Sequence, residues 1–211
     1  MSKTPKQSLL PTLDRFYLKE ALLAYTARFS TTKQKAAQML ERKIMRWGFK
    51  AQKAGLPESA IYEIQENAKV HIPHLLLEMV SLGAINDLEF GRSKVRHSAG
   101  RKSRRLIVAK LSAKGIGSDL LEEAIEEGLG EAGSEKAEAL EVEAALRLAK
   151  KRKIGPFQEE REEGEGMIDE YAEMQKFSKE LGIFARAGFG REIAMRVLKM
   201  PLEEALPYFE E

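Results

Sequence analysis

The stretch Leu-Ser-Ala-Lys-Gly-Ile-Gly-Ser-Asp-Leu-Leu, residues 111–121, is the most informative for the architecture, because a near copy, Phe-Ala-Arg-Ala-Gly-Phe-Gly-Arg-Glu-Ile-Ala, occupies residues 184–194. In each stretch a helix with a basic last turn ends at glycine, and an apolar residue follows. A small linker and an acidic residue then begin a new amphipathic helix. Gly188 stands 73 positions after Gly115. This period is longer than that of the familiar short helical repeats, so it predicts a repeat of three helices.

A degraded third copy lies upstream at residues 44–49, Ile-Met-Arg-Trp-Gly-Phe. It keeps the helix ending, with Gly48 as the expected last position, but no new helix start follows directly after it. Repeats of this kind are typical of helical arrays, whose extended surfaces usually serve binding rather than catalysis.

Composition limits the class of protein. The chain has 211 residues, of which 43% are hydrophobic and 32% charged, and it has no cysteine. The charged share exceeds the roughly 25% that is typical of globular proteins, which suits long solvated helices. Disulfide and thiolate chemistry are excluded. No apolar run approaches the ~18 residues of a membrane span, and residues 1–10 lack the apolar core of a signal peptide. A soluble cytoplasmic protein, without membrane contact, is expected.

The net charge of +2 conceals alternating blocks. Basic residues dominate 1–51, 92–114 and 147–153, whereas 119–143 and 159–170 are acidic. Such a chain can meet nucleic acid with one face and a basic protein surface with another. Helix faces linked by ion pairs between residues i and i+4 explain any single block equally well.

The spacing of apolar residues is helical, and no segment alternates with the period of a strand, so the chain is predicted to be all-α. We expect an elongated array of three tandem three-helix repeats. The predicted parts are a disordered basic tail at 1–12, a first unit at 13–86 with an insertion at about 51–70, a second unit at 87–130, a third unit at 135–200 with an acidic loop at 155–166, and an acidic tail at 201–211.

Catalytic and metal-binding patterns are missing from the sequence. His71 and His74 have no acidic or cysteine ligand nearby, and Pro73 interrupts the helix that would align them. The Gly-x-Gly pieces at Gly115 and Gly188 lack the preceding strand and third glycine of a dinucleotide-binding loop. We therefore expect no enzyme activity, no cofactor and no metal.

The basic segment 92–114 favours a binding role. Arginine binds phosphate oxygens with its planar fork, and Gly100 lets a ligand approach the backbone between two predicted helices. Phe90 is the one aromatic residue nearby, so contact with a nucleic-acid backbone fits better than base stacking. A merely solubilising surface is the alternative. The candidate residues for filament or DNA binding are Arg92, Lys94, Arg96, Arg101, Lys102, Arg104, Arg105 and Lys110.

Four segments together resemble the RecX family. Residues 83–92, Gly-Ala-Ile-Asn-Asp-Leu-Glu-Phe-Gly-Arg, resemble its signature, and 101–116 resemble its basic second helix ending in Lys-Gly-Ile. Residues 184–189 resemble its C-terminal Leu-Ala-Arg-Arg-Gly-Phe, and 40–49 resemble the ending of its first repeat. The sequence departs from the pattern at the 51–70 insertion, at the acidic loop, and at Lys94 and Lys110, which make the middle unit more basic.

The resemblance implies three tandem three-helix units and a modulator, usually an inhibitor, of the RecA recombinase. Members of the family lie along the RecA–single-stranded DNA filament and limit its ATP hydrolysis, strand exchange and coprotease activity, and they are not enzymes. The expected partners are the RecA filament and the single-stranded DNA within it, and the chain is expected to be a monomer. Two other hypotheses remain open: an autonomous DNA-binding protein with helix-turn-helix readers, and an adaptor for another protein.

Overall fold

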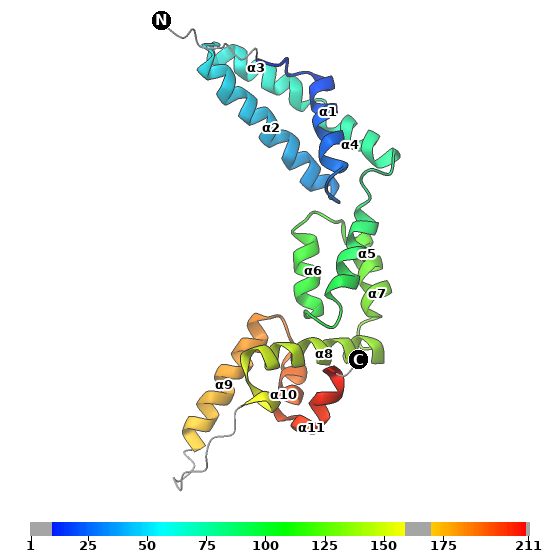
Figure 1. The fold of residues 1–211 in the computed structure, drawn as a ribbon, viewed down its shortest axis with the longest axis vertical. Coiled ribbons are helices and arrows are strands. Elements are labelled where there is room, and N and C mark those ends of the chain that lie inside the picture. Colours follow the sequence, from blue (N-terminus) through cyan, green and yellow to red (C-terminus); the bar gives the residue numbers. More distant parts are fainter. Residues whose placement is uncertain (1–9, 159–169, 210–211) are drawn as a thin grey trace, which may run out of the picture. The chain divides into compact units, whose positions relative to one another are not determined.

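The computed structural model describes residues 10–158 and 170–209, and every regular element in these residues is a helix (Figure 1). The all-α prediction is thus confirmed for this part of the chain. The described residues form two compact units. One holds residues up to Phe90 together with Lys114–Ile116, and the other holds Gly91–Ala113 and the residues from Gly117 onward. The division into three three-helix units stays a prediction.

The first unit is built from α1 (Arg15–Thr26), α2 (Lys33–Lys53), α3 (Glu58–Lys69) and α4 (Ile72–Ser81). Helix α2 contacts the other three helices and supplies the centre of the core with Leu40 and Ile44, both fully buried (Figure 1). Leu10 packs against this core, and the carbonyl of Pro11 accepts a hydrogen bond of 2.7 Å from the Trp47 indole. Part of the predicted tail at 1–12 is therefore packed; its residues 1–9 lie outside the described residues.

The predicted helix end at Gly48 is wrong, because α2 continues through this glycine to Lys53. The helix ends instead before Gly55, whose φ of +87° is left-handed. Gly48 is buried in the middle of α2, where a Cβ would lie 2.3 Å from Nε2 of Gln65. This glycine thus serves the close packing of α3 against α2 rather than a helix stop.

The segment 51–70, predicted as an insertion, contains the last turn of α2 and all of α3. Helix α3 begins after Pro57 and buries Ile61 and Ala68. Its Gln65 side chain donates a 3.1 Å hydrogen bond to the Ile44 carbonyl of α2. The inserted helix is therefore an integral part of the first core.

Helix α5 (Asp87–Ser98) begins in the first unit and continues into the second. The remaining elements are α6 (Arg104–Ser112), α7 (Ser118–Leu129), α8 (Glu135–Arg152), η1 (Gly155–Phe157), α9 (Glu170–Arg186), α10 (Arg191–Lys199), α11 (Leu202–Ala205) and η2 (Leu206–Phe209).

Of the segment 201–211, predicted only as an acidic tail, residues 201–209 pack on the core of the second unit, and residues 210–211 lie outside the described residues. Ala205 is fully buried, and the Phe209 ring meets the Phe157 ring edge-on at 5.6 Å. Four residues of this segment form α11, which begins after Pro201 and has two glutamates in its first turn, where the helix dipole favours negative charge. Of the predicted acidic loop, residues 155–157 form η1, and 159–166 lie outside the described residues.

The two near copies in the sequence form the same turn. Gly115 and Gly188 have φ of +80° and +88°, and the apolar residues after them, Ile116 and Phe189, are buried. A hydroxyl binds the end of each preceding helix: Thr32 Oγ1 donates to the Lys114 carbonyl at 2.6 Å, and Ser103 Oγ donates to the Ala187 carbonyl at 2.7 Å. The predicted helix–glycine–helix pattern is confirmed at both positions.

Thr32 and Ser103 are also the N-cap residues of α2 and α6, and the residue after each of them makes a second contact of the same kind in both places. The Lys33 amide donates to the Asp87 carboxylate, and the Arg104 amide donates to the Glu141 carboxylate, both at 2.8 Å. A carboxylate at a helix N-terminus satisfies a free amide and is favoured by the helix dipole. This recurring joint fixes the start of α6, and with it the direction of the basic residues that follow Ser103.

Candidate functional site

The candidate binding residues lie on two helices of the second unit and on the turn between them. Helix α5 carries Arg92, Lys94 and Arg96, and α6 carries Arg104, Arg105 and Lys110. The start of α5 is set by Asn86, whose side chain accepts a 3.0 Å hydrogen bond from the Glu89 amide. Gly100, with φ of +63°, allows the chain to turn into α6.

Arg92 is directed toward helix α7 rather than toward solvent. Its Nη2 lies 3.0 Å from Oε1 of Glu123, and its Nε lies 2.6 Å from Oε2 of Glu127. The first contact is a hydrogen-bonded ion pair, while the second is an ion pair without hydrogen-bond geometry. The guanidinium therefore ties α5 to α7, and a role for Arg92 in binding stays a prediction.

Arg104 also makes contacts within the chain. Its Nη1 donates a 2.6 Å hydrogen bond to the Gly130 carbonyl, which follows α7, and its amide binds Glu141 of α8. Burial raises the pKa of Glu141, and the hydrogen bond and charge of Arg104 act in the opposite direction. Arg104 thus joins the start of α6 to α7 and α8.

The other six predicted cations are exposed to solvent, fully or in part. Lys94 and Arg96 on α5 are exposed, as are Arg105 and Lys110 on α6. In the turn Arg101 is exposed and Lys102 is half-buried. Within the described residues, the side chains of Arg101, Lys102, Arg105 and Lys110 have no hydrogen-bonding or ion-pair partner. We call these four residues the α6 basic surface.

A hollow of about 510 Å³ borders the α6 basic surface, and sequence reasoning missed it. Arg105 and Val108 line one side, and carboxylates from α8 and α10 line the other: Glu138, Glu141 and Glu192. Glu138 also pairs with Arg196 of α10. The i,i+3 spacing of Glu138 and Glu141 is the only signal in the sequence, and it is too common among helices to identify a site. The hollow can receive a charged side chain from a partner.

Other site types find no support in the part of the chain that the structure describes. Within residues 10–158 and 170–209, no group of three or more acidic or histidine side chains could hold a metal ion. No described helix has both the length and the apolar character of a membrane span. His71 is the N-cap residue of α4, and Pro73 and His74 lie in the first turn of that helix, after α3 has ended at Lys69.

Replacing Arg104 tests its structural role. Arg104→Ala should lower the free energy of unfolding by about 1–3 kcal/mol, because it leaves the Gly130 carbonyl without its charged donor. The neighbouring Arg105→Ala, which removes an exposed side chain without a partner, should change it by no more than about 0.5 kcal/mol. Urea titrations followed by far-UV circular dichroism compare the two variants. Equal losses would contradict the assignment of Arg104 to the framework.

Three comparisons connect the chain to known proteins. Residues 86–125, which span α5, α6 and most of α7, match the family model of the RecX second three-helix domain. The chain is 27% identical over 188 residues to the regulatory protein RecX of Myxococcus xanthus (strain DK1622), covering 86% of this chain and 84% of that protein. Its fold matches the crystal structure of RecX from Lactobacillus salivarius with a TM-score of 0.53 at 18% identity, over 88% of this chain and 95% of that one. The family model, the curated relative and the structural neighbour all support the resemblance of this chain to the RecX family.

Proposed function

We propose that this chain is a regulatory protein that binds the RecA–single-stranded DNA filament and inhibits its ATPase, recombinase and coprotease activities. Its relative in Myxococcus xanthus is named a regulatory protein, and the family match covers the helices that carry the candidate site. In this proposal the chain acts by binding, as a monomer and without catalysis of its own.

The observation that carries the proposal is the α6 basic surface. Arg101, Arg105 and Lys110 are exposed and have no partner within the described residues, so their charges are available to a ligand. Arginine forks fit phosphate and carboxylate oxygens equally well. A filament presents both groups, from its DNA and from acidic side chains of its protein.

Repeated contacts along a filament explain how a small basic surface can bind tightly enough to act. Each contact on the α6 basic surface is exposed and individually weak, since exposed ion pairs contribute about 0–1 kcal/mol. A filament offers the same contacts at many neighbouring positions. When a chain binds at one position, its other binding groups are held at a high effective concentration near the next position. The overall affinity therefore rises without any new kind of contact. A deep pocket is not needed for such binding.

Charge reversal on the α6 basic surface tests the site. Arg101→Glu with Arg105→Glu should weaken binding to RecA filaments by about tenfold, because it removes two exposed contacts of up to about 1 kcal/mol each and places negative charge against the anions of the filament. Arg104 is left intact, since its replacement would damage the framework. Binding is measured by co-sedimentation with filaments, and thermal unfolding of the variant confirms that it is folded.

A matched control reverses two other exposed cations of the same unit, Lys179→Glu and Arg191→Glu, on α9 and α10. It produces the same change in net charge outside the α6 basic surface. Equal weakening in both double variants would show that only the total charge matters. Unchanged binding in Arg101→Glu/Arg105→Glu would remove the α6 basic surface from the interface.

A further inference from the structure

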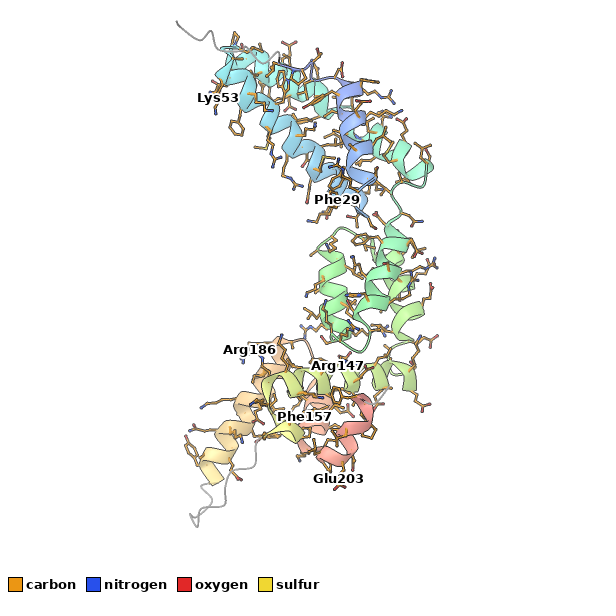
Figure 2. All side chains as sticks on the ribbon, viewed as in Figure 1. Phe29, Lys53, Arg147, Phe157, Arg186 and Glu203 are labelled. Carbon is orange, nitrogen blue, oxygen red and sulfur yellow. The ribbon has the colours of Figure 1, made fainter. Side chains whose placement is uncertain are left out.

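Helix α2 of the first unit carries a stripe of cations with an aromatic ring inside it. Arg42, Arg46, Phe49 and Lys53 are spaced i, i+4, i+7 and i+11, so they share one face of the helix, and all four are exposed. Lys53 lies at the C-terminal end of α2 (Figure 2). This stripe belongs to the first unit, whereas the α6 basic surface belongs to the second.

The cations of the stripe have no internal partners in the part of the chain that the structure describes. Within the described residues, no hydrogen bond or ion pair engages the side chains of Arg42, Arg46 or Lys53, although acidic residues are frequent elsewhere in the chain. Arg42 and Arg46 are i,i+4 neighbours of like charge, an arrangement that destabilises a helix. An anionic ligand along this face would remove that repulsion.

A hollow of about 260 Å³ opens beside the stripe, between α2 and the inserted helix α3. Phe49 from α2 and Tyr62 from α3 both line it, and their side chains are 60% and 65% exposed. The amides of Gln52 and Gln65 line it as well. The Gln65 side chain is held in place by its hydrogen bond to the Ile44 carbonyl. It lies against Gly48, which has no side chain and therefore leaves room for it.

We propose that this face binds an unpaired nucleic-acid strand, with a base in the hollow and phosphates on the stripe. Aromatic rings stack bases of any sequence, and the amide of Gln52 offers both a donor and an acceptor to a base edge. Arg46 and Lys53 stand on either side of Phe49 along the helix, so a strand that stacks a base on Phe49 places its phosphates beside both cations. This site goes beyond the proposed function, because it binds bases as well as phosphates and lies on the first unit.

An acidic protein segment is the competing ligand, and the lining of the hollow argues against it. A peptide would need only charge and apolar area, whereas the hollow combines two exposed rings with two amides, the groups that recognise unpaired bases. Glu58 lines the α3 side of the hollow and would repel phosphate there. The strand backbone is therefore expected to follow α2 and not α3.

The test compares two ligands of equal charge on the full chain. A fluorescein-labelled oligothymidylate carries bases, and an abasic strand of the same length carries only the backbone. Fluorescence anisotropy at low salt should show tighter binding of the oligothymidylate. Phe49→Ala and Tyr62→Ala should each weaken oligothymidylate binding by about 5- to 150-fold, the range for loss of one stacked base, and leave abasic binding unchanged. A matching oligouridylate shows whether RNA serves as well as DNA.

Further variants complete the test. Arg46→Ala should reduce the slope of log affinity against log salt concentration by about 0.7, the value for one lost phosphate contact on a single strand. Phe16→Ala, on α1, removes a ring that is 69% exposed and does not line the hollow, and it should bind like the unaltered chain. Arg101→Glu/Arg105→Glu should keep the preference for bases over the abasic strand, which separates this site from the α6 basic surface.

The proposal is overturned by any of three results: no binding of the oligothymidylate at low salt, equal affinity for the abasic strand, or unchanged binding in both aromatic variants. Displacement of the oligothymidylate by a polyglutamate peptide, with equal affinity for the two strands, would assign the face to an acidic protein segment.

Discussion

Phe184→Ala is expected to lower the free energy of unfolding of the second unit by about 3–5 kcal/mol, the usual cost of deleting a large core side chain. Phe184 is fully buried on α9 and meets the Phe189 ring at 5.9 Å with an interplanar angle of 72°. Its carbonyl also accepts a 3.1 Å hydrogen bond from the Phe189 amide. Removing the ring leaves a cavity at the turn that joins α9 to α10. Urea titration followed by far-UV circular dichroism measures the loss.

Phe16→Ala is the matched control, because the same atoms are removed from a side chain that is 69% exposed. We expect a change within about 0.5 kcal/mol for this surface position. A loss below about 1 kcal/mol for Phe184→Ala would mean that the core at this turn is not packed as described.

Gly188→Ala is expected to cost about 2–4 kcal/mol, as the sum of a left-handed backbone and a damaged helix cap. Gly188 has φ of +88°, and a Cβ there would lie 2.6 Å from Oγ of Ser103. That hydroxyl caps α6 and donates to the Ala187 carbonyl, so moving it breaks both contacts. The joint that positions α6 against α9 and α10 would be weakened, and thermal unfolding should report it as a lower melting temperature.

Gly133→Ala separates the two contributions. Gly133 has a similar φ of +82°, but nothing lies within 4 Å of the position that its Cβ would take. Only the backbone cost of about 1–2 kcal/mol is expected. If the two alanine variants are equally stable, the contact with Ser103 contributes nothing and the joint is not a structural element.

The helices could be predicted from local sequence because the signals that begin and end them are local. The pattern around Gly115 and Gly188 specifies a left-handed residue, a buried apolar residue and a new helix start, and the structure confirms all three. Gly48 shows the limit of this reasoning. It resembles a helix stop in sequence, but its role is set by Gln65, a residue on another helix.

The candidate site was predictable only in outline. Clustering of positive charge identified the region. Four of the eight candidate residues, those of the α6 basic surface, have no internal partners within the described residues. Arg92 and Arg104 have the same side chain as Arg101 and Arg105, yet they bind Glu123 and the Gly130 carbonyl. These partners lie 31 and 26 positions away in sequence, so only the packing of α5, α6 and α7 reveals them. The hollow beside Phe49 was missed for the same reason, because α2 and α3 each contribute one wall.

Regulation of the RecA filament by this chain should be visible in the single-stranded-DNA-dependent ATP hydrolysis of RecA. The chain is added at amounts well below those of RecA, beside the Arg101→Glu/Arg105→Glu variant. We expect a dose-dependent fall in the rate with the unaltered chain and a much weaker fall with the variant. An unchanged rate, even with the chain in excess over RecA, would contradict the account.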